Sequence, residues 1–233
     1  MNRYILILIF LFSGFFIQGT SFYESTEHVY VSINDTSFST WKEDLTQLHG
    51  IPEPAIHLAL NSYFSLVEEN LLKNDSLITI IDFSKASTEK RLFILDLKNK
   101  KIVKKTLVAH GMRSGLNIAE EFSNKRHSNK SSLGLYITNE TYSGKHGYSL
   151  RLDGKSVGLN NNARKRAIVI HGANYVSEKF IKRNDRIGRS FGCPAVSEDE
   201  SEEIINLIKE GSCLFIYHPS IIPISQSDLE KLP

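Results

Sequence analysis

A histidine and a cysteine are the residues of this sequence best suited to chemistry. His171 ends a β-branched run, and Cys193 follows 22 residues later in a turn between Gly192 and Pro194. A cysteine attacks as its thiolate, and a nearby imidazole lowers the thiol pKa and takes its proton. We therefore expect Cys193 to be a nucleophile and His171 its base, both held on a β scaffold. The plainer alternatives are a structural cysteine in a turn and a surface histidine that only ends a strand.

The residues around the cysteine suit the stabilisation of a negatively charged oxygen. Gly192 leaves the backbone free to curl. Consecutive N–H groups around Phe191, Gly192 and Cys193 can then point at a developing oxyanion. Pro194 fixes φ directly after the nucleophile and removes a competing donor. We predict Phe191 and Gly192 as oxyanion-site residues.

Other candidate nucleophiles and bases are weaker. His110 and His146 could line the same cleft, or each could be a turn residue. The serine pair before Gly134 is suggestive of a serine turn, but the start of a hairpin is the better interpretation. The sequence also has no Gly-x-Ser-x-Gly elbow and no phosphate-cradling loop.

The second cysteine and the histidines could also suggest a disulfide or a metal site. Cys213 opens an apolar run that resembles a buried strand, where a cysteine behaves as a small hydrophobe. We therefore favour a free Cys213 over a disulfide with Cys193. A zinc peptidase would need isolated histidines as ligands, because the sequence has neither His-Glu-x-x-His nor Cys-x-x-Cys. We expect no metal and no cofactor.

Short apolar segments separated by turns must position these residues. They are rich in β-branched and aromatic residues and predict a mainly β fold, an antiparallel sandwich or barrel. The predicted strands are residues 77–83, 91–97, 101–109, 133–138, 148–152, 167–171 and 213–217. The lysine-rich stretch 98–105 is expected on the solvent side of a hairpin.

The spacing of apolar residues predicts helices in two regions, one before the predicted strands and one near the end of the β domain. A three-four spacing predicts an amphipathic helix over 52–72, with a shorter helix before it around 41–48. A late helix begins at the capping box Ser197–Glu200 and ends before Gly211.

The first residues resemble a secretory leader. One arginine precedes an apolar run over 5–17, which is shorter than the roughly twenty residues of a membrane span. We expect a signal peptide cleaved near Ser21, with a retained anchor as the alternative, and export to the periplasm or cell envelope. The expected organisation is a signal peptide (1–21), a linker and N-terminal helical region (22–75), a β domain (76–220) and a tail (221–233). The net charge of +2 leaves no basic stripe for nucleic acid.

The motifs together resemble the L,D-transpeptidase (YkuD-type) catalytic domain family. The matching segments are His171-Gly172 and Ser190-Phe191-Gly192-Cys193, with further similarity to a divergent subgroup at 110–115, 122–124, 131–134 and 142–147. The resemblance covers roughly 76–218 and assigns the β domain as the catalytic one. Two departures stand out. Phe191 replaces the usual histidine two residues before the cysteine, and 194–196 lack the usual arginine or asparagine.

The resemblance implies a role for each matched residue. Cys193 would form a thioester with a peptidoglycan stem tetrapeptide, with loss of D-alanine. His171 would be the base toward the thiol and then the acid toward the leaving amine, with the Gly172 carbonyl orienting its ring. Without a second histidine near the cleft, proton handling would rest on His171 alone. The implied substrate-binding residues are Ser190, Arg189, His146 and Tyr142.

The expected function is therefore an exported L,D-transpeptidase, a transferase of cell-wall biogenesis, with peptidoglycan stem peptides as its partners. Transfer of the thioester to a neighbouring amine gives a cross-link. An L,D-carboxypeptidase or endopeptidase on the same stem is the first alternative, and a catalytically silent wall-binding module is the second. The sequence carries no signal for an oligomeric state.

Overall fold

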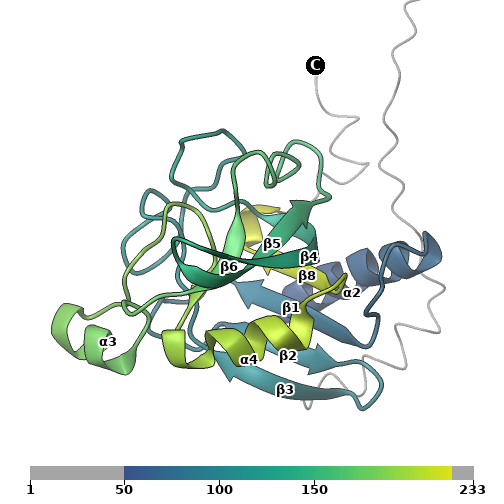
Figure 1. Cartoon of the computed structure of the whole chain (residues 1–233), viewed down its shortest axis with the longest axis horizontal. Coiled ribbons are helices and arrows are strands. Elements are labelled where there is room, and N and C mark those ends of the chain that lie inside the picture. The colour runs from purple at the N-terminus through teal and green to yellow at the C-terminus, as the bar shows by residue number, and fades with distance from the viewer. Residues whose placement is uncertain (1–49, 222–233) are drawn as a thin grey trace, which may run out of the picture. The chain divides into compact units, whose positions relative to one another are not determined.

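A computed structural model describes residues 50–221, which form one eight-stranded sheet with a helix against each face (Figure 1). The strands are β1 (Leu77–Asp82), β2 (Leu92–Asp96), β3 (Lys101–Thr106), β4 (Gly134–Gly144), β5 (Gly147–Gly154), β6 (Val169–Gly172), β7 (Ala195–Val196) and β8 (Cys213–Tyr217). The helices are α2 (Glu53–Glu68), α3 (Glu178–Asn184), α4 (Glu198–Ile208) and the short 3-10 helix η2 (Pro219–Ile221). The prediction of a mainly β fold is confirmed, and each expected strand is present.

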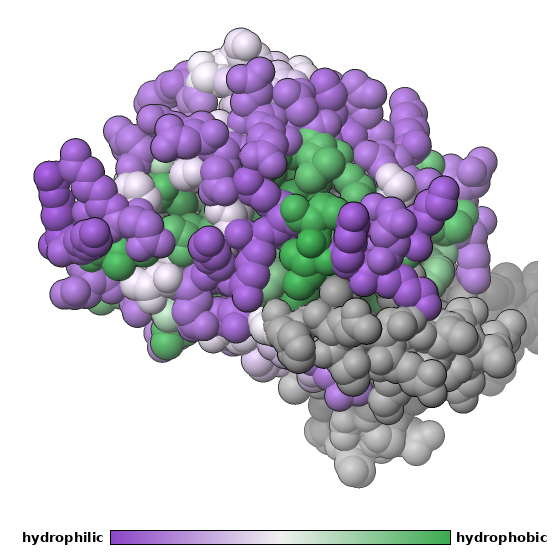
Figure 2. Space-filling view, turned by 90° about the horizontal axis from the view of Figure 1, so that it is seen from below, coloured by the Kyte–Doolittle hydropathy of each residue, from purple (hydrophilic) through white to green (hydrophobic). Residues whose placement is uncertain are grey.

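The strands follow the order β3-β2-β1-β8-β4-β5-β6-β7. β1 pairs in parallel with β8 and β6 with β7, and the other neighbours are antiparallel. The central strands β1 and β8 are buried along their whole length, as their continuous apolar runs require. At the edge, β3 alternates exposed and half-buried residues, and Lys101 and Lys105 face solvent as predicted. Lys104 is half-buried and pairs with Glu200 and Glu203 of α4. From the β3 side, most of the described surface is hydrophilic (Figure 2).

Alternate residues of β1 point into two separate apolar layers. Ile78 and Ile80 pack with the buried face of α2, and Leu77 and Ile81 pack with the isoleucines of α4. α2 contacts both β1 and β8. The predicted amphipathic helix is therefore a wall of the core. It ends at Glu68, short of the expected residue 72.

α4 begins where the sequence predicts, but the capping box is not formed. The Ser197 hydroxyl donates to Glu200 Oε2 at 3.2 Å instead of accepting a backbone N–H. The Glu200 carboxylate also accepts from the Thr106 hydroxyl and pairs with Lys104 Nζ at 3.0 Å. Because Glu200 is engaged with β3, it ties α4 to the edge of the sheet.

Three described elements are absent from the sequence-based expectations, namely α3, β7 and η2. α3 buries no residue, so it has no apolar stripe to reveal it, and β7 is two residues long. The leader, the linker, the helix expected around 41–48 and residues 222–233 lie outside the described residues. Within residues 50–221, no helix is both long and apolar enough to cross a membrane.

Candidate active site

The pairing of β6 with β7 brings the predicted base and nucleophile onto neighbouring strands. His171 lies on β6 directly opposite Ala195 of β7, and Cys193 precedes Ala195 by two residues. Ala109 also bridges to Ala195 from the other side. His171 is thus held by strand pairing, while Cys193 enters from the turn that leads into β7.

Ser190 organises the cysteine turn from within. Its hydroxyl donates to the Cys193 carbonyl at 2.6 Å and accepts the Gly192 N–H at 3.0 Å. Gly192 has a φ of +124°, and a Cβ there would lie 2.8 Å from the Lys130 carbonyl oxygen. This turn therefore requires glycine.

The same contacts revise the predicted oxyanion donors. The Gly192 N–H is engaged by Ser190 and does not point at a substrate oxygen. Among the described hydrogen bonds, the N–H groups of Phe191 and Cys193 have no acceptor. In this turn, the Gly192 N–H is thus occupied, and the Phe191 and Cys193 N–H groups are left available as donors. The Phe191 side chain is 71% exposed.

The Cys193 thiol is half-buried and lies against the end of the preceding loop. Its sulfur is 3.7 Å from the Ala167 carbonyl oxygen, to which the thiol donates. Burial raises the pKa of the Cys193 thiol, and the Val169 N–H and the Arg166 charge act in the opposite direction. In the resting site the sulfur is thus a protonated thiol turned toward Ala167.

The His171 imidazole is buried and has a defined tautomer. Its Nδ1 lies 2.8 Å from the Gly172 carbonyl oxygen. Because a carbonyl only accepts, Nδ1 carries the proton and Nε2 is left with the lone pair of a base. Burial lowers the pKa of His171, and the neighbouring His146 lowers it further against the effect of Gly172. The ring is therefore neutral at pH 7.

His146 brings a second imidazole to the base. It lies in the turn between β4 and β5, and its ring stacks on His171 with centroids 4.4 Å apart and planes inclined by 26°. The expectation that His171 acts without a second histidine nearby is wrong. The second imidazole comes from a hairpin, and Phe191 at the motif position points to solvent.

Tyr142 lies in the same row across the sheet. It pairs with Ser149 of β5, and Ser149 pairs with His171 of β6. The Arg151 guanidinium covers its ring at 4.4 Å from the centroid. Tyr142 is thus two strands from His171, and its ring is already occupied by a cation.

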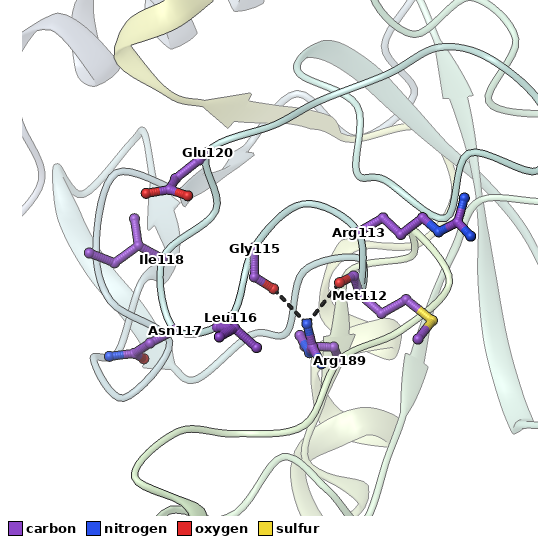
Figure 3. Close-up of a pocket in the computed structure, with 8 residues that line it drawn as sticks. All are labelled: Met112, Arg113, Gly115, Leu116, Asn117, Ile118, Glu120 and Arg189. Atoms are coloured by element: carbon purple, nitrogen blue, oxygen red, sulfur yellow. Dashed lines mark hydrogen bonds between the residues drawn. The ribbon is translucent and has the colours of Figure 1, made fainter.

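Arg189 lies beside the cysteine turn, in a separate open pocket of about 540 Å³ (Figure 3). Its Nη1 donates to the carbonyl oxygens of Met112 and Gly115 at 2.8 and 2.9 Å. The Met112 N–H donates to the Ser190 carbonyl, which joins the pocket to the turn. The lining residues are Met112, Arg113, Gly115, Leu116, Asn117, Ile118, Glu120 and Arg189.

The profile of the L,D-transpeptidase catalytic domain family matches residues 47–217. The chain belongs to this family. The match begins before α2, in agreement with the packing of that helix against the sheet. Among curated proteins, none matches this chain.

Several solved structures are similar to this L,D-transpeptidase-family chain at low identity. An L,D-transpeptidase from Mycobacterium smegmatis is 11% identical over 61% of this chain and 59% of its own, with a TM-score of 0.38. A mutant of the helical cell shape determining protein Pgp2 from Campylobacter jejuni is 13% identical over 72% and 57%, with a TM-score of 0.42. An L,D-transpeptidase from Stackebrandtia nassauensis is 12% identical over 77% of each chain, with a TM-score of 0.37. This chain therefore spans less than two thirds of the first relative, and the family assignment rests on the profile.

His110, which the sequence placed in the cleft or in a turn, is a core residue of this family member. Arg91 Nη2 donates to its Nδ1 at 2.8 Å, and its Nε2 lies 3.3 Å from the Gly115 carbonyl oxygen. Burial and the Arg91 charge lower the pKa of His110 to about 4. Its backbone still serves the site, because its carbonyl accepts the Ser190 N–H at 3.0 Å.

Sequence reasoning missed Arg166, which approaches the cysteine turn from the loop before β6. A Cβ on Gly192 would lie 3.3 Å from Arg166 Nη2. The only signal was a basic run, Arg164–Arg166, directly before the β6 apolar segment.

Both cysteines are free thiols, and Cys213 is buried in β8. Residues 50–221 contain no group of three or more His, Cys, Asp or Glu side chains that could hold a metal ion.

Proposed function

We propose that this chain is a peptidoglycan L,D-transpeptidase that works through an acyl-enzyme at Cys193. The observation that carries the proposal is the pairing of a cysteine turn with a buried, neutral His171 whose Nδ1 proton is fixed by Gly172. A base of defined tautomer on the strand that pairs with the continuation of the cysteine turn suits nucleophilic catalysis. Family membership supplies the substrate class, a stem tetrapeptide of the cell wall.

The reaction starts with proton transfer from the Cys193 thiol to His171 Nε2. The sulfur attacks the carbonyl carbon of the third stem residue, and the N–H groups of Phe191 and Cys193 receive the oxyanion. The tetrahedral intermediate then collapses. The bond to D-alanine breaks, and the leaving amine takes the proton from Nε2. A thioester at Cys193 remains.

The second half returns the enzyme to its resting state. An amine of a neighbouring stem attacks the thioester and gives its proton to Nε2. Collapse forms the cross-linking amide, and the released sulfur takes the proton back. With water in place of the amine, the same steps release the stem peptide with a free carboxylate. The activity is then that of a carboxypeptidase.

We propose that the stem approaches the turn from the side of the Arg189 pocket. Met112 of the pocket lining donates its N–H to the Ser190 carbonyl of the turn, and the pocket offers the exposed aliphatic side chains of Leu116 and Ile118 beside the Arg189 cation. Arg189 is proposed as a ligand of a stem carboxylate and His146 as a contact next to the base. Tyr142 and Ser190 act at a distance from the stem, through the sheet and the turn.

Export also belongs to the proposal. The substrate lies outside the cytoplasm, and the sequence over 1–21 has the pattern of a leader. We propose that the protein works in the periplasm or cell envelope.

The test is mass spectrometry of the purified chain, wild type and Cys193→Ala, after incubation with disaccharide-tetrapeptide. Dimers that have lost one D-alanine, formed by the wild type alone, are the expected product. Tripeptide monomers without dimers would make the protein a carboxypeptidase. If no product depends on Cys193 while both proteins melt at similar temperatures, the enzymatic proposal is wrong and the silent binding module is favoured.

A further inference from the structure

Arg166 holds a positive charge beside the cysteine turn, and no acidic side chain among the described residues pairs with it. Its guanidinium donates to the carbonyl oxygens of Ser123 and Lys130 at 2.5 and 2.6 Å. It also donates to the hydroxyls of Ser132 and Ser128. All four acceptors are uncharged. The side chain is thus fixed in place, and its charge is solvated by dipoles alone.

A second arginine of the same loop shows the contrast. Arg164 donates to Glu140 and to Asp153, at 2.6 Å for its contact with Asp153 Oδ1, so its charge is neutralised at the surface. None of the ion pairs among residues 50–221 includes Arg166. A partly buried cation without a counter-ion is costly to fold. Its retention here calls for an anion that forms nearby during function.

The cysteine turn places that anion next to Arg166. On one side, Arg166 Nη2 faces the Gly192 backbone, the residue before the nucleophile. On the other, the next residue, Ala167, accepts the thiol proton at 3.7 Å from the sulfur. The guanidinium therefore lies against the cysteine turn, and the residue that follows Arg166 in the chain contacts the sulfur.

We propose that Arg166 is the counter-charge of the Cys193 thiolate, a positioning residue that favours ionisation of the nucleophile from outside the cysteine motif. The S–H proton passes to His171 Nε2, and Arg166 keeps its own protons throughout, because a guanidinium is not deprotonated in proteins. Arg166 acts on the sulfur through space and needs no contact with the substrate. The inference rests on the proposed function only in taking Cys193 as the nucleophile.

The other titratable or charged groups around the thiol do not supply a lasting positive charge. The buried His171 is neutral at pH 7, and its pKa is lowered by burial and by His146. Burial raises the pKa of Tyr175 to about 12, so its phenol stays neutral. Arg189 is directed to the backbone of its pocket, and the Lys130 ammonium pairs with Glu121. Of the charged groups that the structure describes around the thiol, Arg166 is thus the permanent cation without an acidic partner.

The experiment measures the ionisation of Cys193 without any substrate. The rate of alkylation by iodoacetamide, a neutral reagent, is followed from pH 5 to 10 in the full chain, and mass spectrometry assigns the label to Cys193 or to the buried Cys213. Wild type is compared with the neutral replacements Arg166→Gln and Arg166→Met and with Arg166→Lys. Arg164→Gln is the matched control, since it removes a neighbouring cation that is paired elsewhere.

Loss of the Arg166 charge should raise the midpoint of the alkylation profile by about 1 pH unit. Because less thiolate is then present, labelling at pH 7 should be roughly tenfold slower. Arg166→Lys should restore most of the shift, and Arg164→Gln should leave the profile unchanged. Two neutral variants are made because one of them could fail to fold. If one variant does not melt cooperatively, the other is used for the test. A folded neutral variant with the wild-type midpoint would overturn the proposal, as would a Lys variant that shifts as far as the neutral ones. If the alkylation midpoint shifts but the protein does not turn over stem peptides, the counter-charge role of Arg166 is supported and the proposed reaction is wrong.

Discussion

At the scale of single residues, the site depends on how His171 is kept neutral and oriented. The Gly172 carbonyl fixes the Nδ1 proton, and the stacked His146 ring opposes a positive charge on the base. A neighbouring imidazole disfavours the charged form of His171, because two like charges repel each other. The stack therefore protects the basic form of His171 in mildly acidic surroundings.

Replacement of His146 by phenylalanine keeps the stacking area and removes the repulsion. The pKa of His171, lowered below its ordinary 6.5 by burial and by His146, should then move upward. NMR titration of the imidazole ring protons measures it directly, and the acidic limb of stem-peptide turnover should move to higher pH with it. His127→Asn, at an exposed position with a φ of +60°, is the control. A His171 titration that stays fixed or falls in His146→Phe would contradict this account of the stack.

At the scale of elements, the loop between β5 and β6 carries Arg166 and must itself be anchored. Asn160 does this from a fully buried position. Its Nδ2 donates to the carbonyl oxygens of Leu133 and Leu135, each at 2.9 Å, and its Oδ1 accepts the Ser156 N–H at 2.9 Å. One side chain thus joins the loop to the start of β4.

Asn160→Ala should destabilise the fold by about 1–3 kcal/mol, because buried backbone groups lose their partners. The thermal midpoint measures the loss, and the alkylation profile of Cys193 should shift in the same direction as in Arg166→Gln if the loop moves. Asn161→Ala is the comparison, since Asn161 pairs with Asn124 at the surface. Equal stability losses in the two variants would show that burial of Asn160 is not what anchors the loop.

The elements also show what sequence reasoning can and cannot reach. Periodicity and β-branched runs predict β1, β8 and α2, because each of these must bury an apolar face. The same reasoning identifies Cys193 and His171 by residue type. It cannot supply the β6–β7 register that joins them, the His146 stack or the Arg166 contact. These depend on strand pairing and loop packing between residues that are distant in sequence, and neither leaves a periodic signal.

At the scale of the whole molecule, the sheet is stable only with both of its apolar layers covered. α2 supplies one cover through Ala55, Ile56, Ala59 and Leu60, which pack against β1, β2 and β8. The second cover is α4, on the side of the active site. The reactivity of each cysteine measures a different property, since Cys193 lies in the active-site turn and Cys213 in the centre of the sheet.

Leu60→Ala should destabilise the whole fold by about 2–5 kcal/mol, because it opens a cavity under the sheet. Leu58→Ala, on the half-buried side of the same helix, should cost less. The lower stability of the fold should be measured as faster alkylation of Cys213. This cysteine is fully buried, so it reacts when the sheet opens. If Cys213 stays as protected in Leu60→Ala as in the wild type, α2 does not contribute to the stability of the sheet.

The position of β8 in the sheet has a consequence for biosynthesis. β8 is the last strand of the described residues, yet it joins β1 on one side and β4 on the other. The half made of β1–β3 and the half made of β4–β7 share no other strand pairing within the described residues. The sheet therefore cannot close until residues 213–217 have emerged from the ribosome, twenty residues after the nucleophile. Until then, the strands that flank the active site have no strand pairing with β1–β3, so the completion of the sheet waits for these residues.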